Sequence, residues 1–353
     1  MTSETSVSKS AVSYSDARAH YLSPRRRDPV KTMSEEPISH RIIANAVDLI
    51  ERAPDAPIRV LDVGSGTGDG FALLTESHGR MRPVVDGSLC RYVGLDVDAD
   101  MITTAAATCS SPNASFVISD VRNELPNDDF DLYLSCGVPY SHLTTVELHS
   151  VLTGLFRRIA DQGRRAVVVI DVLGRYSVEW TPNWDRPRWD YSMSFFEDSK
   201  ECIEDPMSFY DQESLDHVIT DAGEKANVAF PHKSYADRSV LVGRHTATRT
   251  FNPAIPAFRT LINSLVTYTD GPVEARQLRF APPRAGAPDK VLEFFAHYAQ
   301  RWNAIVDTYD NGRRLDHEQS ELFAQELLDC ERQERKGLGA GHSLTATVLI
   351  DAS

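Results

Sequence analysis

The chain has 353 residues, of which 41% are hydrophobic and 25% are charged, a balance typical of a globular protein with one full core and a smaller appended unit. Its formal net charge is −14, so a phosphate backbone would be repelled over most of the surface, and we expect no nucleic-acid partner. The five cysteines contain no CxxC pair, which excludes the common zinc spacings and favours a reducing compartment. No apolar run is long enough for a signal or a membrane span, so we expect a cytoplasmic protein without a membrane partner.

Residues 1–56 form the first predicted unit, an N-terminal arm followed by a lid helix. The first 35 or so residues are polar and lack an apolar period, which predicts an arm that is disordered or ordered only when docked. Its basic cluster, Arg25 to Arg27, is too short for a nucleic-acid arm and is typical of a solvated loop. Apolar residues at helical spacing then predict an amphipathic helix over 36–52.

Residues 57–246 alternate strand-like and helix-like segments with regular spacing. Runs rich in Val, Ile and Leu that alternate with helices indicate strands buried on both faces of a parallel sheet. We therefore predict a doubly wound, mostly parallel, Rossmann-like α/β domain. Its predicted strands are 58–64, 91–98, 114–121, 129–137 and 164–174, with two closing strands in 227–235 and 238–245.

The segment 175–210 breaks this pattern and is predicted to be a long cap loop. It is rich in proline and in aromatic residues, which is unusual for a solvated loop. Its aromatic side chains either close over a site or form a small satellite core under the loop. They are Tyr176, Trp180, Trp184, Trp189, Tyr191, Phe195 and Phe196.

Residues 247–353 are predicted to be a C-terminal helical extension that ends in a strand. Three helices are expected over 256–269, 289–310 and 316–337, and the strand-like run 344–350 needs a sheet edge to join. The apolar face marked by Phe295 and Trp302 either packs on its own domain or forms a homodimer contact.

The stretch LDVGSGTGDG at 61–70 is the main functional signal. Its glycines miss the dinucleotide spacing, because Asp69 or Phe71 would occupy the third glycine position, and no GK[ST] follows. Instead, Asp62 precedes Gly64, Gly66 and Gly68, which places an acid beside bare backbone. That combination suits a ligand that is cationic or zwitterionic at this point.

With these residues, the chain resembles the class I S-adenosylmethionine-dependent methyltransferases over roughly 58–245. LDVGSGTGDG is similar to their first motif, where Ser65 and the glycines approach the methionine part of the cofactor. The resemblance implies that Asp96, with Val97 after it, binds the ribose hydroxyls, and that Asp120 and Val121 contact the adenine. Asp62 as a turn cap and Asp120 as a helix cap are the alternatives, and Asp98 and Asp100 are expected to cap a helix. No metal site is implied.

The fourth predicted strand ends in SCGVPYSHLT, which in the family lies beside the sulfonium and the acceptor. We place Ser135 and Gly137 at the cofactor, and Tyr140 and His142 among the catalytic candidates. His142 has a suitable intrinsic pKa for a base, with a structural histidine as the alternative. Tyr176 and Trp180, nearest the end of the fifth strand, are the further candidates, as rings that face the sulfonium. Asp171 in that strand also faces the crevice if the register is right.

The resemblance implies a methyltransferase that uses S-adenosylmethionine and acts on a small molecule in specialised metabolism. One alternative is a cyclase similar to azetidine-2-carboxylate synthases, in which the cofactor's own amino group displaces methylthioadenosine. The amine must be neutral to attack, and its reference pKa of about 7.7–8.0 makes deprotonation easy once it is desolvated. A catalytically inactive binding subunit is the third possibility.

Overall fold

The computed structural model describes residues 27–53, 55–78, 81–123, 125–193, 203–243, 250–268, 273–310, 312, 314–333 and 336–351. Five parallel strands form one half of its sheet, in the order β3-β2-β1-β4-β5. All residues of β5 are buried, as expected for a strand covered on both faces. The five strands are β1 (Ile58–Val63), β2 (Cys90–Asp96), β3 (Ala114–Ile118), β4 (Leu132–Leu134) and β5 (Ala166–Gly174). The predicted doubly wound, mostly parallel sheet is confirmed.

Two further strands join the sheet through antiparallel pairs. β9 (Ser343–Asp351) pairs with β5, and β8 (Ala229–Arg238) pairs with the far side of β9. The C-terminal strand, which was predicted as part of the C-terminal extension, therefore lies inside the sheet between β5 and β8. The strand predicted over 238–245 is wrong for its described part: residues 239–243 form no strand. The physical reason is that the buried carboxylate of Glu331 accepts the N–H groups of Val240 and Leu241, so these groups join no ladder.

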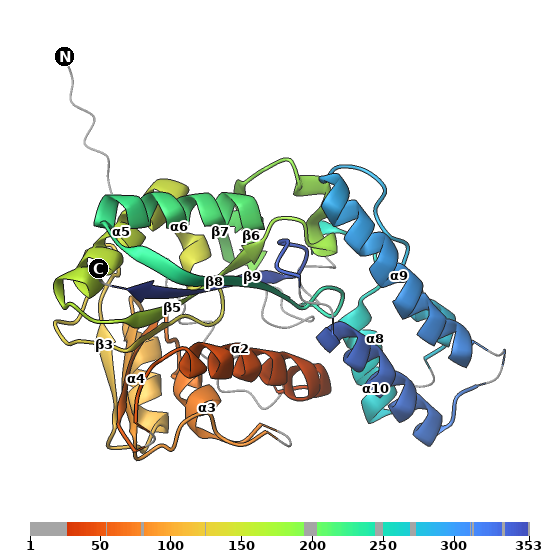
Figure 1. The fold of residues 1–353 in the computed structure, drawn as a ribbon. Coiled ribbons are helices and arrows are strands. Elements are labelled where there is room, and N and C mark those ends of the chain that lie inside the picture. Colours follow the sequence, from red (N-terminus) through yellow and green to blue (C-terminus); the bar gives the residue numbers. More distant parts are fainter. Residues whose placement is uncertain are drawn as a thin grey trace.

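Helices cover both faces of the sheet (Figure 1). α2 (Glu36–Asp48), α3 (Asp69–Thr75) and α4 (Ala99–Thr108) lie on one face, and α5 (Thr145–Asp161) and α6 (Gln212–Ala226) lie on the other. Each face has its own apolar core, with Ile43 and Leu74 in one and Leu152 and Ile219 in the other. α5 begins in a capping box between Thr144 and Glu147, which fixes the helix start directly after the β4 loop.

The segment 175–210 is more regular than predicted. It holds a 3-10 helix, η4 (Val178–Asn183), and a hairpin of β6 (Arg188–Met193) and β7 (Ile203–Tyr210), whose last two residues pair with the end of β5. The prediction of an irregular loop is therefore wrong for its described part. Phe195 and Phe196 lie outside the described residues.

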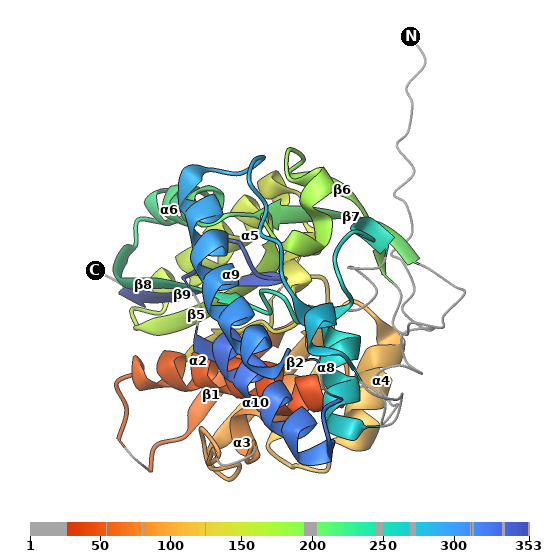
Figure 2. The same ribbon diagram turned by 90° about the vertical axis from the view of Figure 1, so that its right-hand side faces the viewer.

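The C-terminal helices form a third core with this segment. α8 (Phe258–Thr267), α9 (Asp289–Tyr309) and α10 (His317–Gln333), with the short helix η5 (Ala275–Leu278), lie together at one end of the sheet and face the viewer in Figure 2. Phe295 and Trp302 are wholly buried there with Trp180 and Trp184, so the aromatic face of α9 packs on its own chain. The aromatic segment thus forms the satellite core that was one of its two predicted outcomes.

The described chain begins at Arg27 and enters a five-residue π-helix, η2 (Lys31–Glu35), that runs directly into α2. Arg27 pairs with Glu36, whereas Arg25 and Arg26 lie outside the described residues. π-Helical turns are rare and occur often at functional sites.

Among the described helices, none is both long and apolar enough to cross a membrane.

Candidate functional site

The glycine loop connects β1 to α3 at the carboxyl edge of the sheet, where open α/β sheets bind ligands. Gly64, Gly66 and Gly68 have φ angles of 70°, 53° and 88°, a left-handed conformation that glycine adopts without strain. A Cβ on Gly64 would lie 2.4 Å from the Cβ of Pro139, so this glycine also allows the turn after β4 to pack on the loop. A Cβ on Gly66 would meet no atom within 4 Å, so backbone is exposed to open space there.

Asp62 lies at the end of β1 below the loop and is 1% exposed. The Tyr92 hydroxyl donates a 2.5 Å hydrogen bond to its Oδ2, while its buried Oδ1 has no hydrogen-bond partner among the described residues. Burial raises the pKa of Asp62 to about 7. The buried Oγ of Ser65 likewise has no partner within the described chain. An unsatisfied buried polar atom is costly, so these two atoms indicate a ligand that forms hydrogen bonds with them.

Asp96 ends β2 and is organised by the glycine loop. Its Oδ2 accepts the Gly66 N–H at 2.9 Å, and its Oδ1 accepts the Asp98 N–H at 3.0 Å. Burial raises the pKa of this carboxyl. Asp98 accepts the N–H groups of Asp100 and Met101, which confirms that Asp98 caps α4.

Asp120 follows β3 and is bound by Arg122, a residue that sequence reasoning missed. Arg122 Nε lies 3.0 Å from Asp120 Oδ1, and its NH2 lies 2.6 Å from Oδ2, so the pair is bidentate and lowers the pKa of Asp120. Val97 and Ile118, at the adjoining ends of β2 and β3, are 46% and 57% exposed. Apolar surface therefore lies beside both acids. Val121 is partly buried and packs on the sheet core.

Ser135 and Gly137 occupy the end of β4. The Ser135 hydroxyl donates to the Val169 carbonyl and accepts the Asp171 N–H, both at 2.9 Å, so it bridges β4 and β5. The Gly137 N–H donates to Asp171 Oδ2 at 2.9 Å. Ser135 thus positions the strand that carries Asp171, and Gly137 faces open space, since a Cβ there would meet no atom within 4 Å.

Tyr140 and His142 lie on the 3-10 helix η3 (Pro139–His142), which packs on the glycine loop through Pro139. Tyr140 is buried, and burial with the nearby Asp62 carboxyl raises its pKa, so its phenol stays neutral. His142 Nδ1 lies 2.6 Å from Asp205 Oδ2 on β7, and its side chain is 32% exposed. A carboxylate at Nδ1 orients the imidazole ring. Asp205 could not be found from sequence, because it lies 63 positions away in a segment predicted to be a loop.

Tyr176 and Trp180 belong to the aromatic core. Trp180 is 0% exposed, and its Nε1 donates to the carbonyls of Gly174 and Arg175 at 3.0 and 3.2 Å. Tyr176 is 7% exposed and meets Trp184 edge to face at 5.7 Å. Both rings are therefore used in packing beside the end of β5.

Comparison with known proteins gives one family match, in which residues 60–163 match the model of a methyltransferase domain. No curated protein matches the sequence. Among solved structures, a putative methyltransferase of Haloferax volcanii in complex with the Trm112 activator shares 18% identity over 65% of this chain and 82% of its own, with a TM-score of 0.40. The sugar N-methyltransferase KedS8 of Streptoalloteichus shares 15% identity over 66% and 92%, also at 0.40. DesVI of Streptomyces venezuelae shares 19% over 64% and 94%, at 0.39.

Proposed function

We propose that the chain binds S-adenosylmethionine and methylates a small molecule in specialised metabolism, because residues 60–163 match the model of a methyltransferase domain. One observation carries this proposal. Three acids, Asp62, Asp96 and Asp120, end adjacent strands around a left-handed glycine loop, and the innermost one has an unpartnered oxygen among the described residues.

Each part of the site fits one part of the cofactor. Asp62 Oδ1 would accept a hydrogen bond from the α-ammonium group, beside the loop backbone at Gly66. Asp96, already oriented by the Gly66 N–H, would accept hydrogen bonds from the ribose hydroxyls. Asp120 would accept one from the adenine amino group, with the exposed side chains of Val97 and Ile118 against the ring. When bound, the cofactor supplies an electrophilic methyl group.

The pair of His142 and Asp205 supports methyl transfer to an acceptor with an ionisable O–H or N–H group. As the acceptor attacks, His142 Nε2 would take its proton, and Asp205 would stabilise the imidazolium through Nδ1. We propose a small acceptor because the net charge of −14 disfavours nucleic acid.

One observation also supports the cyclase alternative. The pKa of Asp62, about 7, lies within one unit of the reference value for an α-amino group, about 7.7–8.0. Asp62 could therefore take the ammonium proton at little cost and leave a nucleophilic amine. Against this alternative, the rings of Tyr176 and Trp180, which first suggested a closed aromatic pocket, lie in the aromatic core.

A product assay separates the two reactions. The purified protein is incubated with S-adenosylmethionine alone and with a library of small phenols, amines and amino sugars, and the nucleoside products are separated. We expect S-adenosylhomocysteine only with an acceptor, and we expect His142→Gln to lose it while cofactor affinity stays within twofold. His217→Gln, on the exposed face of α6, is the matched control. Methylthioadenosine and a cyclic amino acid without acceptor would replace methyl transfer with the alternative.

A further inference from the structure

The turn after β4 holds two consecutive residues in left-handed backbone. Gly137 has φ 89°, and Val138 has φ 65° and ψ 35°. This conformation is common for glycine but a genuine outlier for a β-branched residue. Val138 is also buried, and the following Pro139 packs on Gly64 of the glycine loop. Something in the surrounding structure must hold this turn, and the glycine loop depends on its position.

Asp171 on β5 is the group that holds it. Its Oδ2 accepts the Gly137 N–H at 2.9 Å and the Val138 N–H at 3.2 Å, and its Oδ1 accepts the Thr345 hydroxyl at 3.0 Å. The residue is 2% exposed. One carboxylate therefore orients both left-handed N–H groups from a strand that is itself buried along its length.

Arg238, the last residue of β8, compensates the buried charge of Asp171. Its NH2 lies 2.8 Å from Asp171 Oδ2, its Nε donates to Ser343 Oγ at 2.9 Å, and its NH1 donates to Ser39 Oγ at 3.0 Å. A buried ion pair is stable only when its remaining donors are also satisfied, and here they are distributed over β9 and α2. The guanidinium thus links the turn to α2.

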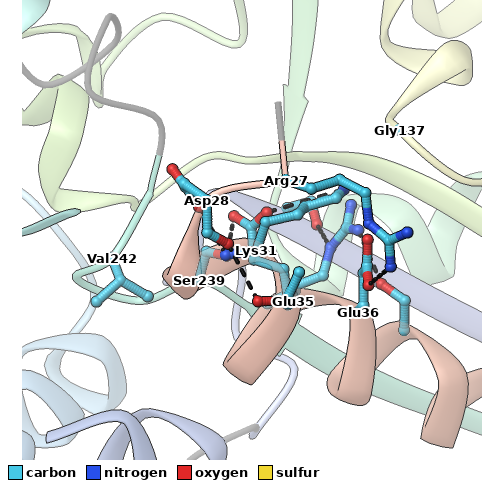
Figure 3. A network of polar contacts seen from close by, with 12 residues as sticks. Arg27, Asp28, Lys31, Glu35, Glu36, Gly137, Ser239 and Val242 are labelled. Atoms are coloured by element: carbon cyan, nitrogen blue, oxygen red, sulfur yellow. Dashed lines mark hydrogen bonds and ion pairs between the residues drawn. The ribbon is translucent and has the colours of Figure 1, made fainter. Parts of the chain in front are cut away.

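The network continues into the N-terminal segment (Figure 3). Ser239, next to Arg238, donates to Glu35 at 3.2 Å. Arg259 on α8 binds Glu35 through NH1 at 2.7 Å and binds Asp28 through Nε and NH2, both at 2.9 Å. Hydrogen bonds and ion pairs therefore extend from the C-terminal helices through η2 and α2 toward the turn.

We propose that Asp171 and Arg238 are positioning residues of the site: they hold Val138 in its left-handed conformation, and thereby set the place of Pro139 against the glycine loop. The inference rests on the proposed function, because its consequence is the affinity for S-adenosylmethionine. Neither residue belongs to the three acids that we assign to the cofactor.

The test uses the full chain with Asp171→Asn, Arg238→Met and the conservative Arg238→Lys. We measure amide hydrogen exchange of Gly137 and Val138 without ligand, and the Kd of S-adenosylmethionine by calorimetry. Asp171→Asn and Arg238→Met should accelerate exchange at both amides and raise Kd, each at least tenfold, and Arg238→Lys should recover part of both effects. Asp161→Asn, exposed at the end of α5, is the matched control.

A second variant separates positioning from a general loss of stability. Val138→Gly removes the cost of the left-handed conformation, because glycine adopts it freely. The double variant Asp171→Asn/Val138→Gly should bind S-adenosylmethionine at least threefold more tightly than Asp171→Asn alone. A merely structural role predicts that it binds more weakly. Wild-type exchange rates in Asp171→Asn, or a double variant that binds more weakly than the single one, would overturn the proposal. If wild-type protein binds no S-adenosylmethionine, the proposed function fails, while the exchange rates still decide the role of Asp171.

Discussion

The buried carboxyl of Asp62 predicts how cofactor binding depends on pH. Burial raises its pKa from 3.8 to about 7, and the Tyr92 hydroxyl opposes this rise by donating a hydrogen bond to Oδ2. If the cofactor's ammonium group binds the ionised form, binding below pH 7 must release a proton from Asp62. We therefore expect the affinity for S-adenosylmethionine to fall as the pH is lowered from 7 to 5.

The size of the effect follows from the ionised fraction of Asp62. With a pKa of about 7, roughly 90% of Asp62 is ionised at pH 8 and about 1% at pH 5, so the Kd should rise about 100-fold, or about 2.7 kcal/mol. Above about pH 8, deprotonation of the ligand's amine should weaken binding a second time. The stability of the ligand-free protein depends on pH with the opposite sign. The folded state keeps the Asp62 proton up to about pH 7, whereas the unfolded chain loses it near pH 3.8. The free energy of unfolding should therefore fall as the pH rises from about 3.8 to about 7.

Isothermal titration calorimetry from pH 5 to 8.5, in buffers of different ionisation enthalpy, measures both the Kd and the proton release. Asp62→Asn should bind weakly at every pH and lose the acid limb. Tyr92→Phe should move the acid limb to higher pH, because it removes the hydrogen bond that favours the carboxylate. An acid limb that survives in Asp62→Asn, or that moves to lower pH in Tyr92→Phe, would refute the reasoning.

Three further variants test other parts of the site. Gly64→Ala should lower the free energy of unfolding by about 1–3 kcal/mol and weaken cofactor binding, because Gly64 has φ 70° and packs against the ring of Pro139. In the same thermal unfolding experiments, the control Gly154→Ala on α5 should be neutral or stabilising. Trp180→Phe should cost about 1–3 kcal/mol in urea unfolding with kcat per folded molecule unchanged; a lower kcat at unchanged stability would place the ring at the reaction. Asp120→Asn should raise the Kd about tenfold and narrow the preference for adenine over a hypoxanthine analogue; an unchanged preference would remove it from the adenine site.

Much of the sheet could be predicted from the sequence because its strands carry a local signal. The buried run of β5 and the regular alternation with helices define parallel strands, and in such a sheet the residues that end the strands meet at one edge. That is why Asp62, Asp96 and Asp120 could be predicted to lie at the edge of the sheet that carries the glycine loop. Each acid is found at the end of its own predicted strand, and the closeness of the three acids follows from the order of the strands in the sheet.

The partners of these residues could not be predicted, because each pairing joins distant segments. Asp205 lies on a hairpin that its prolines and aromatic residues made similar to a loop, and Arg238 meets Asp171 only because β9 enters the sheet from the far end of the chain. The role of the aromatic side chains in 175–210, as a cover of the site or as a satellite core, could not be predicted for the same reason. Trp180 is enclosed by a C-terminal segment whose position no local pattern encodes.

The network at the N-terminal segment limits the possible sources of the predicted acid limb. Arg259 and Lys31 hold the pKa of Glu35 well below its usual value despite burial, and Arg259 is itself 7% exposed. A depressed carboxyl pKa gives stability that is present above the unfolded value, near 4.5, and is lost only as the pH falls toward the folded value. Glu35 therefore keeps its ion pair with Arg259 between pH 5 and 8. Loss of cofactor affinity in that range therefore does not arise from Glu35, whereas the raised pKa of Asp62 lies within it.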